Sequence, residues 1–157
     1  YFYEDLPYPD MKKEALTAKS SLNILLIEDD PTDEMLFRKA VVKFKHDVVI
    51  MSYTNGEDAL AYLRAQNSNK GKDTIHLIFL DLNLPRMDGH KVLKALKSNH
   101  NTKDIPVVVL TNSLDPEDCE KSYQGFCSGY ITKSMDVSKY FAKLDRVISY
   151  WKSVALP

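Results

Sequence analysis

The sequence predicts an α/β protein with a doubly wound, five-stranded parallel sheet in the order 2-1-3-4-5. Two observations predict this fold. Short apolar runs alternate with amphipathic stretches of helical length from residue 22 onward. These runs also lack the in-and-out pattern of a half-exposed strand, as is typical of strands buried on both faces. Because parallel neighbours need a right-handed helical crossover, the alternation favours helices on both sides of the sheet.

The apolar runs predict five strands. They span residues 22–27, 48–53, 77–80, 106–110 and 130–132. Each run is of ordinary strand length and too short for a typical helix. We therefore expect a five-stranded sheet whose carboxyl edge collects the residues that follow each strand.

Five helices are expected between and after these strands. The first begins at Asp30 and Pro31 and the fourth at Asp115 and Pro116, since Asp caps a helix and Pro fits its first turn. The other three span residues 55–64, 89–97 and 136–153. Apolar stripes should face the sheet. They comprise Met35, Leu36, Ala40, Val41 and Phe44 in the first helix, Val92, Leu93 and Leu96 in the third, and Val137, Phe141, Leu144, Ile148 and Trp151 in the last.

The chain is expected to hold one domain, residues 22–157, after an N-terminal extension at residues 1–21. Its 157 residues suffice for one well-buried core. The extension lacks sustained periodicity, and Met11 followed by two lysines resembles a natural start, which leaves the origin of residues 1–10 open. Residues 66–73 are expected to form a polar loop.

Composition excludes several classes of function. The 21 Lys and Arg against 22 Asp and Glu give a net charge of -1, without the basic excess that nucleic-acid binding requires. No apolar run approaches the length of a membrane span. Cys119 and Cys127 form no redox or disulfide motif, which favours a reducing compartment. We expect a cytoplasmic protein without nucleic-acid or membrane partners.

Polar residues follow four of the predicted strands. They are Glu28, Asp29 and Asp30 after the first, Asp81 and Asn83 after the third, Thr111 and Asn112 after the fourth, and Lys133 after the fifth. Two carboxylates about 4 Å apart repel by roughly 4 kcal/mol at an effective dielectric near 20. Such a cluster therefore calls for a cation, and all-oxygen ligands suit Mg²⁺. We expect Asp29 and Asp81 to bind the ion directly.

Two further residues suggest phosphate chemistry at the same edge. Lys133 could balance the charge of Asp81 and then that of a phosphoryl group. The Thr111 hydroxyl could donate to a phosphoryl oxygen. A carboxylate cluster with a cation, a lysine and a hydroxyl together favour a site that binds a phosphoryl group.

Four motifs that carry these residues resemble the receiver domain of two-component response regulators, a flavodoxin-like fold. The sequence reads I-E-D-D-P at 27–31, F-L-D-L-N-L-P-x-M-D-G at 79–89, V-V-V-L-T-N at 107–112 and G-Y-I-T-K at 129–133. The resemblance covers about residues 22–153. The L-D-L-N-L-P run, K-S after the last strand and Y-W-x-x-x-x-L-P ending also resemble small regulators that partner phytochrome-type histidine kinases.

The resemblance implies a role for each matching residue. Asp81 is the implied phosphoacceptor, and Lys133 the implied partner of the phosphoryl oxygens. Implied roles at the metal and the switch complete the set: Asp29 and the Asn83 carbonyl as Mg²⁺ ligands, Glu28 as an acid that reaches the metal through water, Thr111 as the switch hydroxyl, and Tyr130 as the aromatic that changes rotamer with it.

Two positions depart from the family pattern. Asn112 stands where a small residue is usual, so its side chain could narrow access to Asp81 and alter the lifetime of the acyl phosphate. Ser134 replaces the usual proline after Lys133. A cis bond before a residue other than proline costs about 2.5–4 kcal/mol. We nevertheless expect cis at Lys133–Ser134, with packing that holds the strained form so that Lys133 reaches Asp81.

Two other classes of protein fit less well. A Mg²⁺-dependent aspartate-nucleophile phosphohydrolase needs a second acid two residues after the nucleophile, where this chain has Asn83. A flavin-binding module on the same fold needs a Gly-, Ser- or Thr-rich loop after the first strand, where this chain has two aspartates and Glu28.

The last helix carries more apolar surface than one buried stripe requires. Tyr140, Val147, Tyr150 and Val154 lie off the stripe described above. Large exposed apolar patches mark interfaces, so this face is a candidate for a homodimer or a protein partner.

The resulting hypothesis is a single-domain response regulator rather than an enzyme, with only self-phosphorylation and self-dephosphorylation of its own. A sensor histidine kinase or histidine phosphotransfer protein, of phytochrome type on the narrower resemblance, would phosphorylate Asp81. Thr111 and Tyr130 would then change the surface around the fourth helix, fifth strand and fifth helix. Its output is expected to be protein binding.

Overall fold

The computed structural model describes residues 21–66 and 74–154 and contains the predicted five-stranded parallel sheet. Its order is β2-β1-β3-β4-β5, as the sequence predicts. The strands are β1 (Leu22–Ile27), β2 (Val48–Tyr53), β3 (Leu77–Asp81), β4 (Val107–Thr111) and β5 (Gly129–Thr132). The N-terminal extension and most of the polar loop lie outside the described residues, so both expectations stay predictions.

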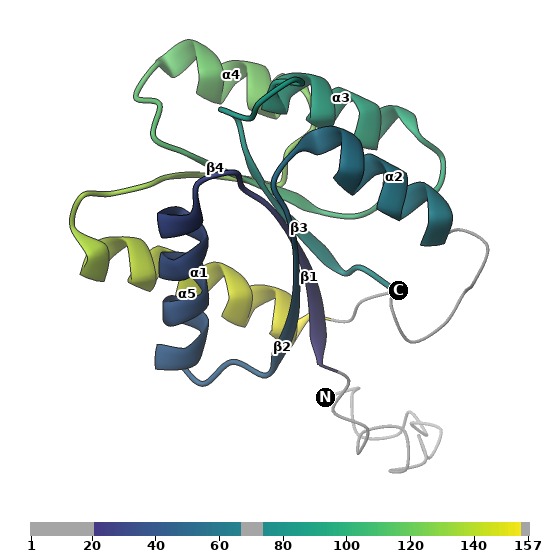
Figure 1. Ribbon diagram of the computed structural model, residues 1–157. Coiled ribbons are helices and arrows are strands. Elements are labelled where there is room, and N and C mark those ends of the chain that lie inside the picture. The colour runs from purple at the N-terminus through teal and green to yellow at the C-terminus, as the bar shows by residue number, and fades with distance from the viewer. Residues whose placement is uncertain (1–20, 67–73, 155–157) are drawn as a thin grey trace, which may run out of the picture.

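Helices cover both faces of the sheet. They are α1 (Pro31–Lys43), α2 (Gly56–Gln66), α3 (Gly89–Ser98), α4 (Pro116–Gln124) and α5 (Val137–Ser153). Figure 1 shows α1 and α5 on one face of the sheet and α2, α3 and α4 on the other. The described part of the chain has no helix long and apolar enough to cross a membrane.

Capping residues start the helices where the sequence predicts. The Asp30 carboxylate accepts hydrogen bonds from the Thr32 and Asp33 backbone N–H groups, at 2.7 and 3.2 Å, and starts α1. Asp115 caps α4 through the N–H of Glu117 at 2.9 Å. Each cap satisfies backbone donors that have no partner within the helix. These caps fix where each chain segment leaves the carboxyl edge of the sheet.

Each face of the sheet has its own apolar core. The α1–α5 side packs around Ile24, Phe37, Phe79 and Leu144, and the rings of Phe37 and Phe79 meet edge to face at 4.9 Å. The opposite side packs around Ile27, Leu80, Val92, Leu96 and Val109, all fully buried. β3 and β4 are buried along their whole length, as the absence of alternation in their sequences predicts.

The buried stripes of two helices differ from the predicted ones. In α1, Met35 is 46% exposed and Phe37 takes its place in the core. In α5, Val137 is 42% exposed whereas Tyr140 is 3% exposed. A helical stripe of period 3.6 can be drawn one or two residues off when apolar residues occupy adjacent positions. Tyr140 therefore belongs to the core and not to the exposed face proposed for it.

Candidate functional site

The carboxyl edge of the sheet brings three carboxylates onto the ammonium group of Lys133. Lys133 Nζ donates hydrogen bonds to Glu28 Oε2 at 2.6 Å, Asp33 Oδ2 at 2.7 Å and Asp81 Oδ2 at 3.0 Å. The side chains of Lys133, Glu28 and Asp81 are at most 7% exposed, and that of Asp33 is 22% exposed. The residues come from the ends of β1, β3 and β5 and from the first turn of α1, so the sheet topology itself builds the cluster.

Backbone hydrogen bonds fix Asp81 and the residue that follows it. Its Oδ1 accepts a hydrogen bond from the Asn83 N–H at 3.0 Å. The Gly89 N–H donates to the Leu82 carbonyl at 2.8 Å. A Cβ on Gly89 would lie 2.4 Å from both the Asp81 carbonyl oxygen and Leu82 Cα, closer than real atoms approach. The glycine of the M-D-G motif therefore lets α3 start directly against the end of β3.

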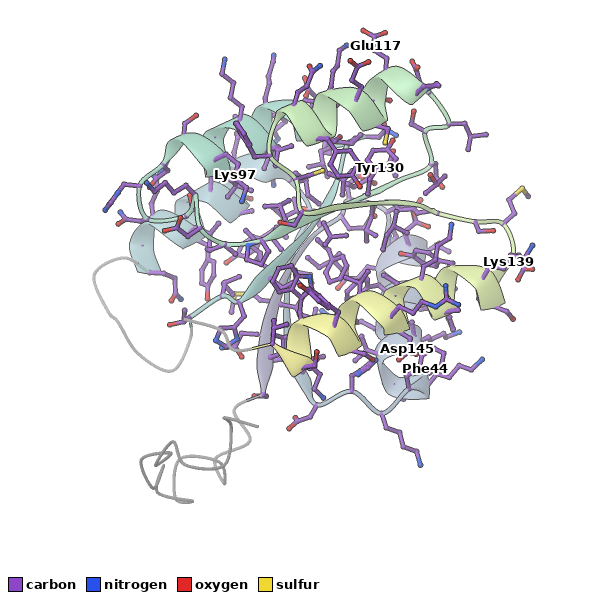
Figure 2. All side chains as sticks on the ribbon, turned by 180° about the vertical axis from the view of Figure 1, so that it is seen from behind. Phe44, Lys97, Glu117, Tyr130, Lys139 and Asp145 are labelled. Atoms are coloured by element: carbon purple, nitrogen blue, oxygen red, sulfur yellow. The ribbon has the colours of Figure 1, made fainter. Side chains whose placement is uncertain are left out.

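Thr111 and Tyr130 lie on the two neighbouring strands. Thr111 is fully buried, and its Oγ1 accepts a hydrogen bond from the Ser113 N–H at 3.0 Å. The Tyr130 hydroxyl is buried without a hydrogen-bond partner among the described residues, and burial raises its pKa. Figure 2 shows Tyr130 between the sheet and α4. Because buried hydroxyl groups normally make hydrogen bonds, another rotamer of Tyr130 that supplies a partner would be more favourable for its hydroxyl.

The peptide bond between Lys133 and Ser134 is trans, as are all peptide bonds in the described ranges. The expectation of a cis bond was therefore wrong. The Lys133 N–H donates to the Thr111 carbonyl at 2.8 Å, which extends the β4–β5 ladder past the last strand residue. This bond fixes the backbone at Lys133, and the long side chain reaches Asp81 without a cis peptide.

The cluster is short of positive charge. Although burial lowers it, the hydrogen bonds to Asp33 and Glu28 hold the pKa of Lys133 well above its ordinary value. Burial raises the pKa of Glu28 to about 7, although the hydrogen bond from Lys133 acts in the opposite direction. Three carboxylates thus share one ammonium group, and the closest of their oxygens lie within 4.8 Å of one another. This all-oxygen, negatively charged donor set fits a hard divalent cation such as Mg²⁺.

The predicted metal ligands do not all meet in this cluster. Glu28 and Asp81 do, but the side chain of Asp29 is exposed and lies outside the group of mutually close oxygens. Asn83 is exposed, and the structure describes only its N–H bond to Asp81. The roles of Asp29 and of the Asn83 carbonyl as ligands stay predictions.

Two residues of the site were missed by sequence reasoning. Asp33 binds Lys133 from α1, and Tyr140 lies in the core close enough for the charges of Lys133 and Asp33 to affect its phenol. Burial raises the pKa of Tyr140 well above its ordinary value. Asp33 lies three residues after the cap Asp30, a position where an acid is already favoured by the helix dipole. Nothing in the sequence therefore marked it as part of the site.

Comparison with known proteins defines the class. Residues 24–145 match the response regulator receiver domain, and the chain belongs to this family. It is therefore a response regulator, a signalling protein of two-component systems, with the flavodoxin-like fold predicted above. Mg²⁺ is the cofactor that this family and this donor set imply.

More specific similarity is to regulators of phytochrome signalling. The chain is 36% identical over 135 residues to response regulator Rcp1 of Synechocystis sp. (strain ATCC 27184 / PCC 6803 / Kazusa), covering 85% of this chain and 92% of Rcp1. The phosphorylated cyanobacterial phytochrome response regulator RcpA superposes with a TM-score of 0.78 at 36% identity, over 87% of this chain and 99% of RcpA. The Mn²⁺-bound form of Rcp1 gives a TM-score of 0.76 at 36% identity, with the same coverage.

These findings give no support to the phosphohydrolase alternative. The residue two positions after Asp81 is an exposed asparagine, Asn83, whose amide cannot protonate a leaving group. The family match covers 122 residues, from 24 to 145, and includes every residue of the cluster around Lys133.

Proposed function

We propose that the chain accepts a phosphoryl group on Asp81 from a phosphohistidine of a sensor histidine kinase or histidine phosphotransfer protein. The observation that carries this proposal is the Asp81 carboxylate, fixed by Asn83 N–H and paired with Lys133 at 3.0 Å. A carboxylate oxygen attacks phosphorus, the P–N bond of the donor breaks, and the imidazole leaves with the electron pair. A bound divalent cation would neutralise the charge on the phosphoryl oxygens.

Lys133 contributes by changing partners. In the structure its ammonium group is shared by three carboxylates, and Asp81 is one of them. Once a phosphoryl group is on Asp81, the same ammonium is in position to pair with its oxygens as a point charge. Glu28, Asp33 and Asp29 are the acids that would hold the cation near Asp81.

The switch would use the two hydroxyl residues beside the site. Thr111 Oγ1 presently accepts from Ser113, which leaves its own proton available to a phosphoryl oxygen. Movement of the β4–α4 loop toward Asp81 would leave room for the Tyr130 ring, whose hydroxyl now lacks a partner in the described structure. The buried, unpartnered hydroxyl of Tyr130 on β5 supports the proposal that phosphorylation changes the surface formed by α4, β5 and α5. Asn112 is exposed next to Thr111, where it would influence access of water to the acyl phosphate.

The test is phosphorylation by acetyl phosphate with Mg²⁺, followed by intact-mass measurement. The wild-type chain should gain one phosphoryl group, and Asp81→Asn should gain none. Asp47→Asn removes an exposed carboxylate in the α1–β2 loop and serves as the control. Normal phosphorylation of Asp81→Asn would sink the proposal. The same assay followed over time, after removal of acetyl phosphate, measures the rate at which the chain removes its own phosphoryl group.

Exposed apolar side chains around the site support a protein as the natural donor. Met135 and Leu114, in the loops beside Asp81, are 102% and 86% exposed. Along α1 an open groove of about 540 Å³ is lined by Pro31, Met35 and Val42 among others. Apolar surface of this kind marks a protein interface, and the groove begins at Pro31, where α1 leaves the carboxyl edge of the sheet. By its similarity to Rcp1 and RcpA, we propose a phytochrome-type histidine kinase as the donor.

Substitution on α1 can separate docking from chemistry. Val42→Asp places a charge on the groove, where Val42 is 75% exposed, without touching the acidic cluster. Phosphotransfer from a phosphorylated phytochrome-type kinase should fall by about tenfold or more, whereas phosphorylation by acetyl phosphate should be unchanged. Val49→Asp, on an exposed residue of β2, is the matched control. Equal loss in both assays would show that the change acts on the fold.

We further propose that α5 mediates homodimer formation in the cytoplasm, where Cys119 and Cys127 would stay unpaired. Tyr150 is 58% exposed and meets Trp151 edge to face at 5.1 Å, which leaves an aromatic patch at the end of α5. Tyr140 no longer supports the proposal because it is buried. Sedimentation of wild type and Tyr150→Asp, with and without a phosphoryl analogue, tests it. A wild-type monomer at high concentration under both conditions would count against it.

A further inference from the structure

An exposed aromatic residue occupies a strained backbone position at the end of α4. Phe126 has φ of 67°, in the left-handed region, and its side chain is 75% exposed. Side chains with a Cβ are disfavoured in this region, and glycine is usual where a helix ends in this way. The strain at Phe126 is therefore not offset by burial of its ring.

The neighbouring glycine does not relieve this strain. Gly125 has φ of −80° and caps α4, so it does not use its conformational freedom. It is required for packing instead, because a Cβ there would lie 2.9 Å from Leu93 Cδ2 on α3. α4 thus approaches α3 closely through Gly125, and the next residue turns its aromatic ring outward.

Two backbone hydrogen bonds hold the left-handed turn, from the Phe126 N–H to the Tyr123 carbonyl and from the Cys127 N–H to the Ser122 carbonyl, both at 3.0 Å. These bonds account for the backbone conformation but not for the exposure of a large aromatic ring, and exposed apolar surface of this kind tends to mark interfaces.

Phe126 borders a groove between α3 and α4 with a volume of about 490 Å³. The groove is lined mainly by apolar surface, including Leu93, with Lys94, Lys97 and Lys121 around it. None of its lining residues is an aspartate or glutamate. Figure 2 shows Lys97 on the α3–α4 side of the molecule, on the opposite side of the sheet from Asp145 and Lys139 on α5.

The lysines of this groove retain capacity to bind an anion. Lys94 is exposed and makes no ion pair within the described ranges. Lys121 pairs with Glu117 at 2.9 Å, but both side chains are more than half exposed, so the pair is weak. The ammonium of Lys97 donates to the Lys103 and Ile105 carbonyls rather than to a carboxylate. The groove therefore combines an apolar floor with positive charge that no buried acid neutralises.

We propose that this groove binds an acidic segment of a partner protein, which packs an apolar side chain against Phe126 and Leu93 and places carboxylates near Lys94 and Lys121. Charge complementarity carries the choice of occupant. A nucleic acid is disfavoured because the chain has a net charge of -1 and so lacks the basic excess that phosphate backbones require. This surface does not involve Asp81, so the inference is independent of the proposed phosphoacceptor role.

The probe is the acetylated peptide Glu-Glu-Leu-Leu-Asp-Glu, titrated into the ¹⁵N-labelled full chain. We expect saturable shifts of the backbone amides of Leu93, Lys94, Gly125 and Phe126, and no shifts with a peptide in which lysine replaces each acid. The double variant Lys94→Glu and Lys121→Glu should weaken binding by about tenfold or more. Lys139→Glu on α5 is the matched control and should bind as wild type does.

Phe126→Gly tests the strained position separately. It should raise the midpoint of thermal unfolding, since it relieves the left-handed strain, and it should abolish the peptide shifts. A lower midpoint would show that Phe126 stabilises the fold, which overturns the inference.

Other occupants are outcomes of the same experiment. Absence of groove shifts, equal shifts with the lysine peptide, or binding of a single-stranded oligonucleotide in place of the acidic peptide would each overturn the proposal. Residues 1–10 hold three acids and no lysine or arginine. If their removal alone moves the groove resonances, the occupant is the chain's own N-terminal segment, and the partner proposal fails.

Discussion

The two edges of the sheet break ordinary folding rules in different ways. At the carboxyl edge, Glu28, Asp81 and Lys133 bury charges that would each be costly alone, and the charges compensate one another. At the amino edge, where α4 leads into β5, Phe126 adopts a left-handed backbone conformation and exposes its ring. Backbone hydrogen bonds at the end of α4 hold that conformation, but the described chain does not bury the ring. The carboxyl edge compensates most of its buried charge internally, although its carboxylates outnumber its ammonium group, whereas the ring exposed at the amino edge would be buried only by a contact from outside the chain.

This difference determines how substitutions should behave. Removing the single ammonium group at the carboxyl edge leaves three carboxylates uncompensated and should cost the most stability, whereas removing one of the surplus carboxylates should cost little. Removing the exposed ring of Phe126 should not lower the free energy of unfolding. Single substitutions should therefore change the free energy of unfolding by amounts that differ from residue to residue.

The largest effect is expected for Lys133→Met, which leaves three carboxylates without a cation. Loss of one partner from a buried ion pair costs about 3–5 kcal/mol of unfolding free energy. We expect a loss of that order in urea denaturation without divalent ions, partly recovered by added Mg²⁺. Lys139→Met, in the exposed first turn of α5, should change stability by less than about 0.5 kcal/mol. Equal losses of unfolding free energy in the two variants would show that Lys133 does not compensate the buried carboxylates.

Gly89→Ala should give the next largest effect. Its Cβ would lie 2.4 Å from the Asp81 carbonyl and from Leu82 Cα, which are backbone atoms that cannot rotate away. Overpacking of this kind costs about 1–3 kcal/mol. Gly129→Ala is the matched control, because its Cβ would meet Val108 Cγ2 at an ordinary 3.6 Å. Thermal unfolding of both variants should show a loss only for the first.

The fold was predictable because its signals are local and repeated. Apolar runs without alternation identified buried strands, and Asp–Pro pairs identified the starts of α1 and α4. Strand ends then placed Glu28, Asp81, Thr111 and Lys133 at one edge before any contact was known. These inferences need only the spacing of apolar residues along the sequence and the common direction of parallel strands.

The remaining features depend on contacts that no local pattern specifies. Asp33 resembles an ordinary acid in a first helical turn, yet its carboxylate reaches a lysine 100 residues away. Tyr140 was predicted to lie off the buried stripe and Phe37 was left out of one, because neighbouring apolar residues allow two stripes and only packing against the sheet selects one of them. The bond at Lys133–Ser134 is trans because the long side chain of Lys133, rather than a strained backbone, spans the distance to Asp81, and no local pattern specifies that reach.

A smaller effect of opposite sign is expected for Asp81→Asn. This change keeps the shape of the side chain and removes one of three carboxylates that share the Lys133 ammonium. Without divalent ions the unfolding free energy should hold or rise by about 1 kcal/mol, since relief of carboxylate repulsion offsets the weaker bond to Lys133. Urea denaturation in a chelator measures it, with Asp47→Asn as the neutral comparison. A loss comparable to that of Lys133→Met would mean that Asp81 is the main partner of the lysine.

The smallest effect is expected for Asp33→Asn, which tests how much the most exposed ion pair of the cluster contributes to stability. Asp33 is the most exposed of the three acids, with 22% of its side chain accessible, and ion pairs near the surface are worth about 0–1 kcal/mol. Because Lys133 keeps both Glu28 and Asp81, the loss of unfolding free energy should stay within that range. Glu28→Gln, at a residue that is 2% exposed, should differ more from wild type under the same conditions. Phosphorylation of Asp33→Asn by acetyl phosphate with Mg²⁺ should be slower than in wild type, because Asp33 is one of the acids proposed to hold the cation near Asp81. An unchanged rate would show that Asp33 serves only as a partner of Lys133.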